Sequence, residues 1–122
     1  MGDYKTVFSK YLSFSLHDRL DQHSLLRESA RLFLDSGDAD TIFAHELAHQ
    51  IFVHRSIMGA SKAYESAALL DKELALLSLN VARVAHDKSG EIIPYLEEVI
   101  YYSTGEEKKL LELELKQLQS QR

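Results

Sequence analysis

The apolar residues of the segment 62–86 recur at alternating steps of three and four, and this spacing constrains the fold more than any other feature of the chain. It is shared by Ala67, Leu70, Leu74, Leu77, Val81 and Val84. A helix brings residues at such intervals onto one face, whereas a strand requires alternation with a period of two. The pattern therefore predicts a long helix over 62–86 with a continuous face for packing against other helices.

Helical spacing also appears on both sides of this segment. Gly37 can adopt the left-handed conformation that ends one helix, and Asp38 or Asp40 can cap the next. Pro94 fits the first turn of a helix, where its missing N–H does no harm. Thr104-Gly-Glu-Glu107 has capping-box spacing, so a further helix is expected to begin there or to continue the preceding one after a kink. The expected helices cover about 3–12, 18–35, 41–59 and 62–86, followed by one that contains Pro94 in its first turn and a segment that begins at Thr104.

No segment keeps a strand pattern, and short loops separate the helices. We therefore expect an all-α fold, an antiparallel up-and-down four-helix bundle with the short N-terminal helix laid across one end. With 122 residues, 45% of them hydrophobic, the chain has the size and composition of a single domain over 1–122. The polar segment 106–122 resembles the start of a linker helix.

The charge balance narrows the choice of partners. The chain carries 14 Lys and Arg against 19 Asp and Glu, a formal charge of -5, which argues against nucleic acids and anionic membranes. It has no cysteine, so disulfides and thiolate metal sites are excluded. No run approaches the ~20 apolar residues of a membrane span. We therefore expect a soluble, cytoplasmic protein whose partners are proteins or small molecules.

The segment 41–60 holds half of the six histidines and has two distinct helical faces. One stripe is expected to be buried and comprises Phe43, Ala44, Leu47, Ile51, His54 and Met58. His45 and His49 fall on the opposite side, one turn apart, with apolar Ile42, Phe52 and Val53 around them. This face is typical of a docking surface centred on a histidine. The alternative is a central helix that neighbours cover on most sides.

The spacing around His49 resembles the histidine-containing phosphotransfer (HPt) family over about 18–103. That family has the motif Ala-His-x-Leu-Lys-Gly, a Gly-Ala pair ten residues after the histidine, and a later Leu-Glu. Here Ala48-His49-x-Ile51 is followed ten residues later by Gly59-Ala60, and then by Leu70-Asp71. The resemblance implies a four-helix bundle that accepts a phosphoryl group on His49.

The resemblance also implies the partners and the chemistry. They would be the receiver domain of a response regulator, a hybrid histidine kinase, or both, in a two-component phosphorelay. A neutral imidazole can attack an aspartyl phosphate, and the receiver supplies Mg²⁺ and a lysine. The protein would then be a phosphocarrier without a cofactor of its own. Its partner-binding residues would be Ile42, Phe52, Val53, Ser56 and Gly59.

Two positions depart from the family, and a second histidine competes. Phe52 and Val53 stand where the family has Lys-Gly, which supplies positive charge and leaves room for the partner. An interaction module of the same fold without phosphotransfer is therefore the alternative. His45, in Ala44-His45-Glu-Leu47, is the second candidate acceptor, but its interval to Gly59 is one turn too long. The segment 43–47 is also similar to the phosphorylation box of histidine kinase dimerisation domains.

A zinc site is the third interpretation of the same residues. His45-Glu46-Leu-Ala-His49 matches HExxH, in which two histidines bind zinc and the glutamate activates water. A catalytic site needs a third protein ligand, and the position nineteen residues after His49 is Ala68. Metallopeptidases also hold their substrate on a strand, and none is expected here. Of the other histidines, His54 is expected to be a hydrogen-bonded core residue, whereas surface or helix-end positions are expected for His17, His23 and His86.

Overall fold

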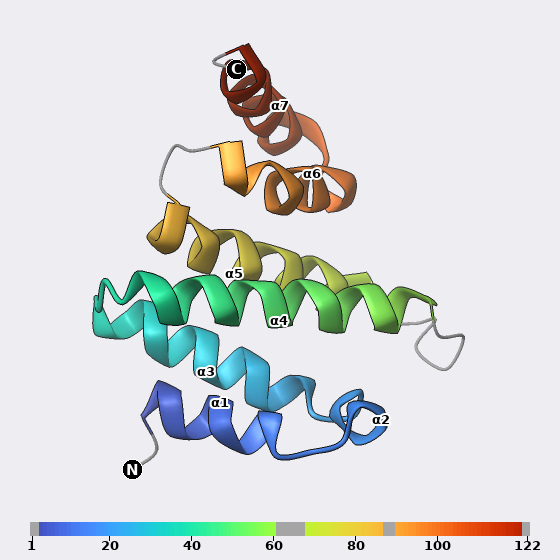
Figure 1. Ribbon diagram of the computed structural model, residues 1–122. Coiled ribbons are helices and arrows are strands. Elements are labelled where there is room, and N and C mark those ends of the chain that lie inside the picture. Colours follow the sequence, from blue (N-terminus) through green and yellow to red (C-terminus); the bar gives the residue numbers. More distant parts are fainter. Residues whose placement is uncertain (1–2, 61–67, 87–89, 121–122) are drawn as a thin grey trace.

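The computed structural model describes residues 3–60, 68–86 and 90–120, and these residues are helical apart from short connections, with no strand. This confirms the expected all-α class. In chain order the helices are α1 (Tyr4–Leu12), α2 (Leu16–Arg19), α3 (His23–Ser36), α4 (Thr41–Ala60), α5 (Ala68–His86), the 3₁₀ helix η2 (Gly90–Ile92), α6 (Ile93–Tyr102) and α7 (Gly105–Ser120) (Figure 1).

The helices stack in layers around the α4–α5 pair, which has the most extensive contact (Figure 1). On one side lies α3 with α1 along it, and on the other side α6 packs on α5 and α7 packs on α6. The N-terminal helix thus lies beside α3 instead of crossing one end of the bundle. It does so because its apolar side chains fill the space between α3 and α4. Phe8, for example, meets Phe43 of α4 edge to face, with ring centroids 5.4 Å apart.

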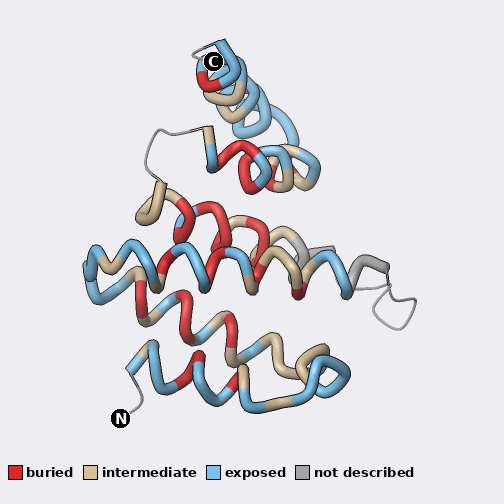
Figure 2. Tube along the Cα trace, viewed as in Figure 1, coloured by how far each residue is buried: buried red, intermediate tan, exposed pale blue. Residues whose placement is uncertain are grey.

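The core is concentrated where α4 meets α5 (Figure 2). Ala44, Leu47 and Ile51 of α4 are inaccessible to solvent, as are Leu74 and Val81 of α5. This confirms the buried stripe and the packing face that periodicity predicted. Met58 of the expected stripe and Ala67 and Leu70 of the expected packing face have side chains outside the described part of the structure.

Several predicted helix ends are confirmed. Gly37 follows α3 with φ 69°, a left-handed conformation that favours glycine. Asp40 caps α4, since its Oδ1 accepts a hydrogen bond from the backbone N–H of Phe43 at 3.0 Å. Pro94 lies in the first turn of α6. The sequence also predicts an N-cap at Ser61 and a turn over Lys88-Ser89-Gly90, and Ser61, Lys88 and Ser89 lie outside the described residues.

The single helix expected over 18–35 is instead divided into α2 and α3. The side chain of Ser15 caps α2 by accepting a hydrogen bond from the backbone N–H of Asp18. Arg19 then donates to the carbonyl oxygens of Phe14 at 2.9 Å and Leu12 at 2.7 Å. These bonds hold α2 against the end of α1, so the chain turns before α3 begins.

A break separates α6 from α7. Ser103 is extended, with φ -99° and ψ 160°, and Gly105 has φ 62°. The helix expected after Thr104 is therefore confirmed as a separate one. Ion pairs fix α7 to α5 at Lys72–Glu107, 3.3 Å, and at Arg83–Glu114, 2.5 Å.

Candidate functional site

The histidine face of α4 is open to solvent. His45 and His49 are exposed, whereas Ala44, Leu47 and Ala48 on the other side of the helix are inaccessible. Along the open face, Ile42, His49 and Ser56 recur every seven residues and are all exposed, Ile42 to 81%. The helix is therefore central in the bundle and yet keeps one uncovered strip.

The two residues that replace Lys-Gly lie at opposite edges of this strip and pack onto neighbours. Phe52 is half-buried against Tyr95 of α6, with ring centroids 5.6 Å apart and ring planes at 75°. Val53 is half-buried and lines a cavity of about 20 Å³ together with Tyr11 and Arg19. Of the expected partner-binding residues, Ile42 and Ser56 are thus on the open strip, and Phe52 and Val53 flank it. Gly59 lies in the last turn of α4.

A chain of hydrogen bonds runs from His45 through a second histidine to a carboxylate. Nδ1 of His45 lies 2.8 Å from Nε2 of His86, in the last turn of α5. Nδ1 of His86 lies 2.7 Å from Oε2 of Glu91, in η2. The His86 side chain is 19% exposed and that of Glu91 69%. His86 therefore does lie at a helix end, but sequence reasoning missed its bond to His45.

The ring of His49 has a different environment. Within the described residues, no hydrogen bond or ion pair involves it, although it lies one turn from His45 on the same exposed side. Both candidate acceptors are thus exposed, and they differ in the hydrogen bonds that hold the ring.

The described residues do not fit a catalytic zinc site. Among residues 3–60, 68–86 and 90–120, no group of three His, Asp or Glu side chains is placed to hold a metal ion. His45 directs Nδ1 to His86, and His49 adds the second nitrogen of the HExxH pattern, with Glu46 exposed between them. Residues 3–60, 68–86 and 90–120 therefore supply no third ligand beside His45 and His49.

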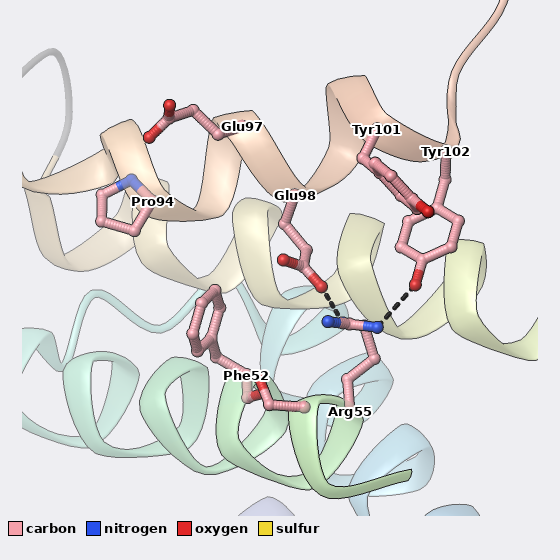
Figure 3. A pocket seen from close by; sticks show the side chains of 8 residues that line it. Phe52, Arg55, Pro94, Glu97, Glu98, Tyr101 and Tyr102 are labelled. Carbon is pink, nitrogen blue, oxygen red and sulfur yellow. Dashed lines mark hydrogen bonds and ion pairs between the residues drawn. The ribbon is translucent and has the colours of Figure 1, made fainter. Parts of the chain in front are cut away.

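An open groove of about 660 Å³ lies beside the strip, between α4 and α6 (Figure 3). On its floor Arg55 forms an ion pair with Glu98 and donates to the hydroxyl of Tyr102 at 2.5 Å. The Arg55 and Glu98 side chains are only 14% and 15% exposed. The remaining lining residues are Phe52, Ser56, Pro94, Glu97 and Tyr101. Sequence reasoning missed this groove, because its two walls are more than 35 residues apart in the chain.

The third histidine of α4 serves the core, as predicted. His54 is 2% exposed, and its Nδ1 lies 2.8 Å from the hydroxyl of Tyr11 in α1. Burial, followed by the charge of His23, lowers the pKa of His54 from 6.5 to about 4. His54 is therefore neutral at neutral pH and has no access to a partner.

Comparison with protein-family models, curated proteins and solved structures finds no match to this chain. Within the described residues, no helix combines the length and apolar character needed to cross a membrane. The side chains of the α4 face and the residues that support them are therefore the features that bear on function.

Proposed function

We propose that this protein is a histidine phosphocarrier whose α4 face accepts a phosphoryl group from an aspartyl phosphate of a receiver domain and returns it. One observation carries the proposal: His45 and His49 are both exposed on one side of a helix whose opposite side is buried at Ala44, Leu47 and Ile51. A nucleophile placed in this way is rigidly held and still reachable by another protein.

The proposal includes a four-helix core made of α1, α3, α4 and α5 in up-and-down order. Successive helices of this set alternate in direction (Figure 1). Besides the α1–α3 and α4–α5 pairs, Tyr4 of α1 contacts Phe43 of α4, with ring centroids 4.8 Å apart. Arg27 of α3 forms an ion pair with Glu73 of α5. Each of the four helices would thus have two neighbours within the core, with α6 and α7 packed outside it.

The packing of Phe52 and Val53 bears on the departure from the HPt motif. Both side chains lean away from the open strip, toward α6 and toward α1. The exposed strip along His49 therefore includes Ile42 and Ser56, and Phe52 and Val53 flank it, which leaves room for a partner. The missing lysine removes a positive charge, and Mg²⁺ and the lysine of the receiver would neutralise the phosphoryl group instead.

A decisive test is transfer of radiolabelled phosphate from phosphorylated receiver domains to the purified protein. Acid-labile, alkali-stable label is expected on the wild type and on His17→Gln, which removes an exposed histidine outside α4. Label is expected to be absent from the double variant His45→Gln/His49→Gln. Label that persists in the double variant, or a wild type that no receiver labels, would contradict the proposal.

The second candidate is an interaction module that binds a partner without phosphotransfer. The α4–α6 groove favours it, because the half-buried Phe52 and Tyr101, which is 80% exposed, both line it. Exposed tyrosines are enriched where proteins bind one another. This candidate would be supported if a receiver binds the wild type and the double histidine variant with equal affinity and labels neither.

A further inference from the structure

The two exposed histidines of α4 differ in how their rings are held, and this difference bears on which nitrogen reacts. His45 is tied through Nδ1 to His86, and His86 is tied to Glu91. Among the described residues, the ring of His49 has no comparable bond. A reactive group gains when a neighbour fixes its orientation and tautomer.

The carboxylate sets the direction of the hydrogen bonds. Since an ionised carboxylate only accepts, Nδ1 of His86 donates its proton to Glu91. When His86 carries only the proton on Nδ1, its Nε2 has a lone pair that can accept a hydrogen bond from Nδ1–H of His45, 2.8 Å away. The lone pair of His45 is then on Nε2, the nitrogen that does not face His86. A free imidazole populates two tautomers, whereas these hydrogen bonds favour the Nδ1–H tautomer of His45.

We infer that Nε2 of His45 is the phosphoryl-accepting atom of the α4 face, and that His86 and Glu91 are its positioning residues. This inference rests on the proposed function and changes its leading residue, because sequence spacing ranked His49 first. Spacing describes where a histidine falls along the helix, whereas the hydrogen bonds describe which ring is prepared for attack.

The transfer step balances without any further reagent. The lone pair of His45 Nε2 attacks the phosphorus of the aspartyl phosphate, so an N–P bond forms. The P–O bond to the aspartate breaks, and the carboxylate leaves with the electron pair. Positive charge develops on the His45 ring, whose Nδ1–H shares its proton with His86 Nε2. The carboxylate of Glu91 offsets this charge through His86, as the acid of a catalytic triad stabilises its imidazolium. The reverse step returns the phosphoryl group.

Single variants show which of the two histidines accepts the phosphoryl group. In the labelling experiment described above, His45→Gln is expected to lose the label and His49→Gln to keep it. Mapping the phosphohistidine is expected to find phosphorus on Nε2 of His45. Label that is lost only in His49→Gln, or attached to Nδ1 of His45, would overturn this inference and leave the proposed function intact. A wild type that no receiver labels would instead overturn the proposed function.

The positioning role has a readout that needs no partner. Nitrogen NMR of the unphosphorylated wild type is expected to show His45 as the Nδ1–H tautomer. In His86→Leu the tautomers are expected to mix, and the labelling rate to fall about 10- to 100-fold. His86→Gln offers an amide oxygen as acceptor, so it is expected to restore the tautomer. Glu91→Gln should slow labelling, whereas the exposed control Glu28→Gln should not. An Nε2–H tautomer in the wild type, or equal rates in His86→Leu and wild type, would overturn the inference.

Discussion

The hydroxyl of Tyr11 and Nδ1 of His54 lie 2.8 Å apart between α1 and α4, both out of contact with solvent. Burial raises the pKa of Tyr11 to about 12 and lowers that of His54 to about 4. Both groups are therefore neutral over the working pH range, and a hydrogen bond joins them. This pair joins the N-terminal helix to the helix that carries the exposed histidines.

The depressed pKa of His54 predicts a stability that falls in mild acid. Between pH 6.5 and about 4 the unfolded chain binds a proton at this histidine and the native protein does not. The free energy of unfolding should thus decrease as the pH falls through this window, by up to about 3 kcal/mol. Urea unfolding at about pH 7 and about pH 5 checks this. His54→Gln should flatten the profile, and His17→Gln, at an exposed site, should leave it unchanged.

Removal of the Tyr11 hydroxyl should destabilise the protein although the ring remains. In Tyr11→Phe, Nδ1 of the buried His54 loses its hydrogen-bond partner, which costs about 1–3 kcal/mol. The matched control is Tyr101→Phe, since Tyr101 is 80% exposed and its change should stay within about 0.5 kcal/mol. Equal unfolding free energies for the two variants would contradict the role assigned to the bond.

The ion pair on the floor of the groove should be strongly coupled. Arg55 and Glu98 are largely buried, so removal of either partner leaves a charge without compensation. A double-mutant cycle with Arg55→Met and Glu98→Gln should give a coupling of about 1–3 kcal/mol. The Lys109–Glu106 pair, with side chains 73% and 86% exposed, is the comparison and should give less than about 0.5 kcal/mol. Similar coupling energies for the two pairs would contradict the prediction that burial strengthens the Arg55–Glu98 pair.

Substitution by alanine at two isoleucines of α4 should have different effects, one on stability and the other on partner binding. Ile51 is inaccessible, so Ile51→Ala should cost about 2–5 kcal/mol of unfolding free energy. Ile42 is 81% exposed, so Ile42→Ala should change stability by less than about 0.5 kcal/mol. If the open strip binds a receiver, Ile42→Ala should weaken that binding about tenfold in a titration. Unchanged affinity would remove Ile42 from the docking surface.

Local features of the fold could be predicted from the sequence because they depend on neighbours in the chain. The burial of Leu47 and Ile51 follows from helical periodicity, and the ends of α3 and α4 follow from Gly37 and Asp40. The exposure of His49 follows from the same periodicity. The break between α2 and α3 could not be predicted, because the bonds of Arg19 form only once α1 has ended beside it.

The support for the site depends on how helices pair. His45 and His86 are 41 residues apart and meet because α4 and α5 pack as a pair that brings the start of one beside the end of the other (Figure 1). A histidine near each of these two ends was visible in the sequence, and an assumed register of the hairpin would have connected them. Phe52 and Tyr95 needed a further step, the placement of α6 across α5, which no local pattern contains.

The position of α7 has a consequence for how the molecule opens. It is the outermost layer, with Leu118 buried but Leu110 and Leu113 at 64% and 58% exposure. Within the described residues its extensive contacts are with α6 alone, so its amides should exchange with deuterium well before those of α4. If α7 unfolds alone, the α4 histidines, His86 and Glu91 would stay in place.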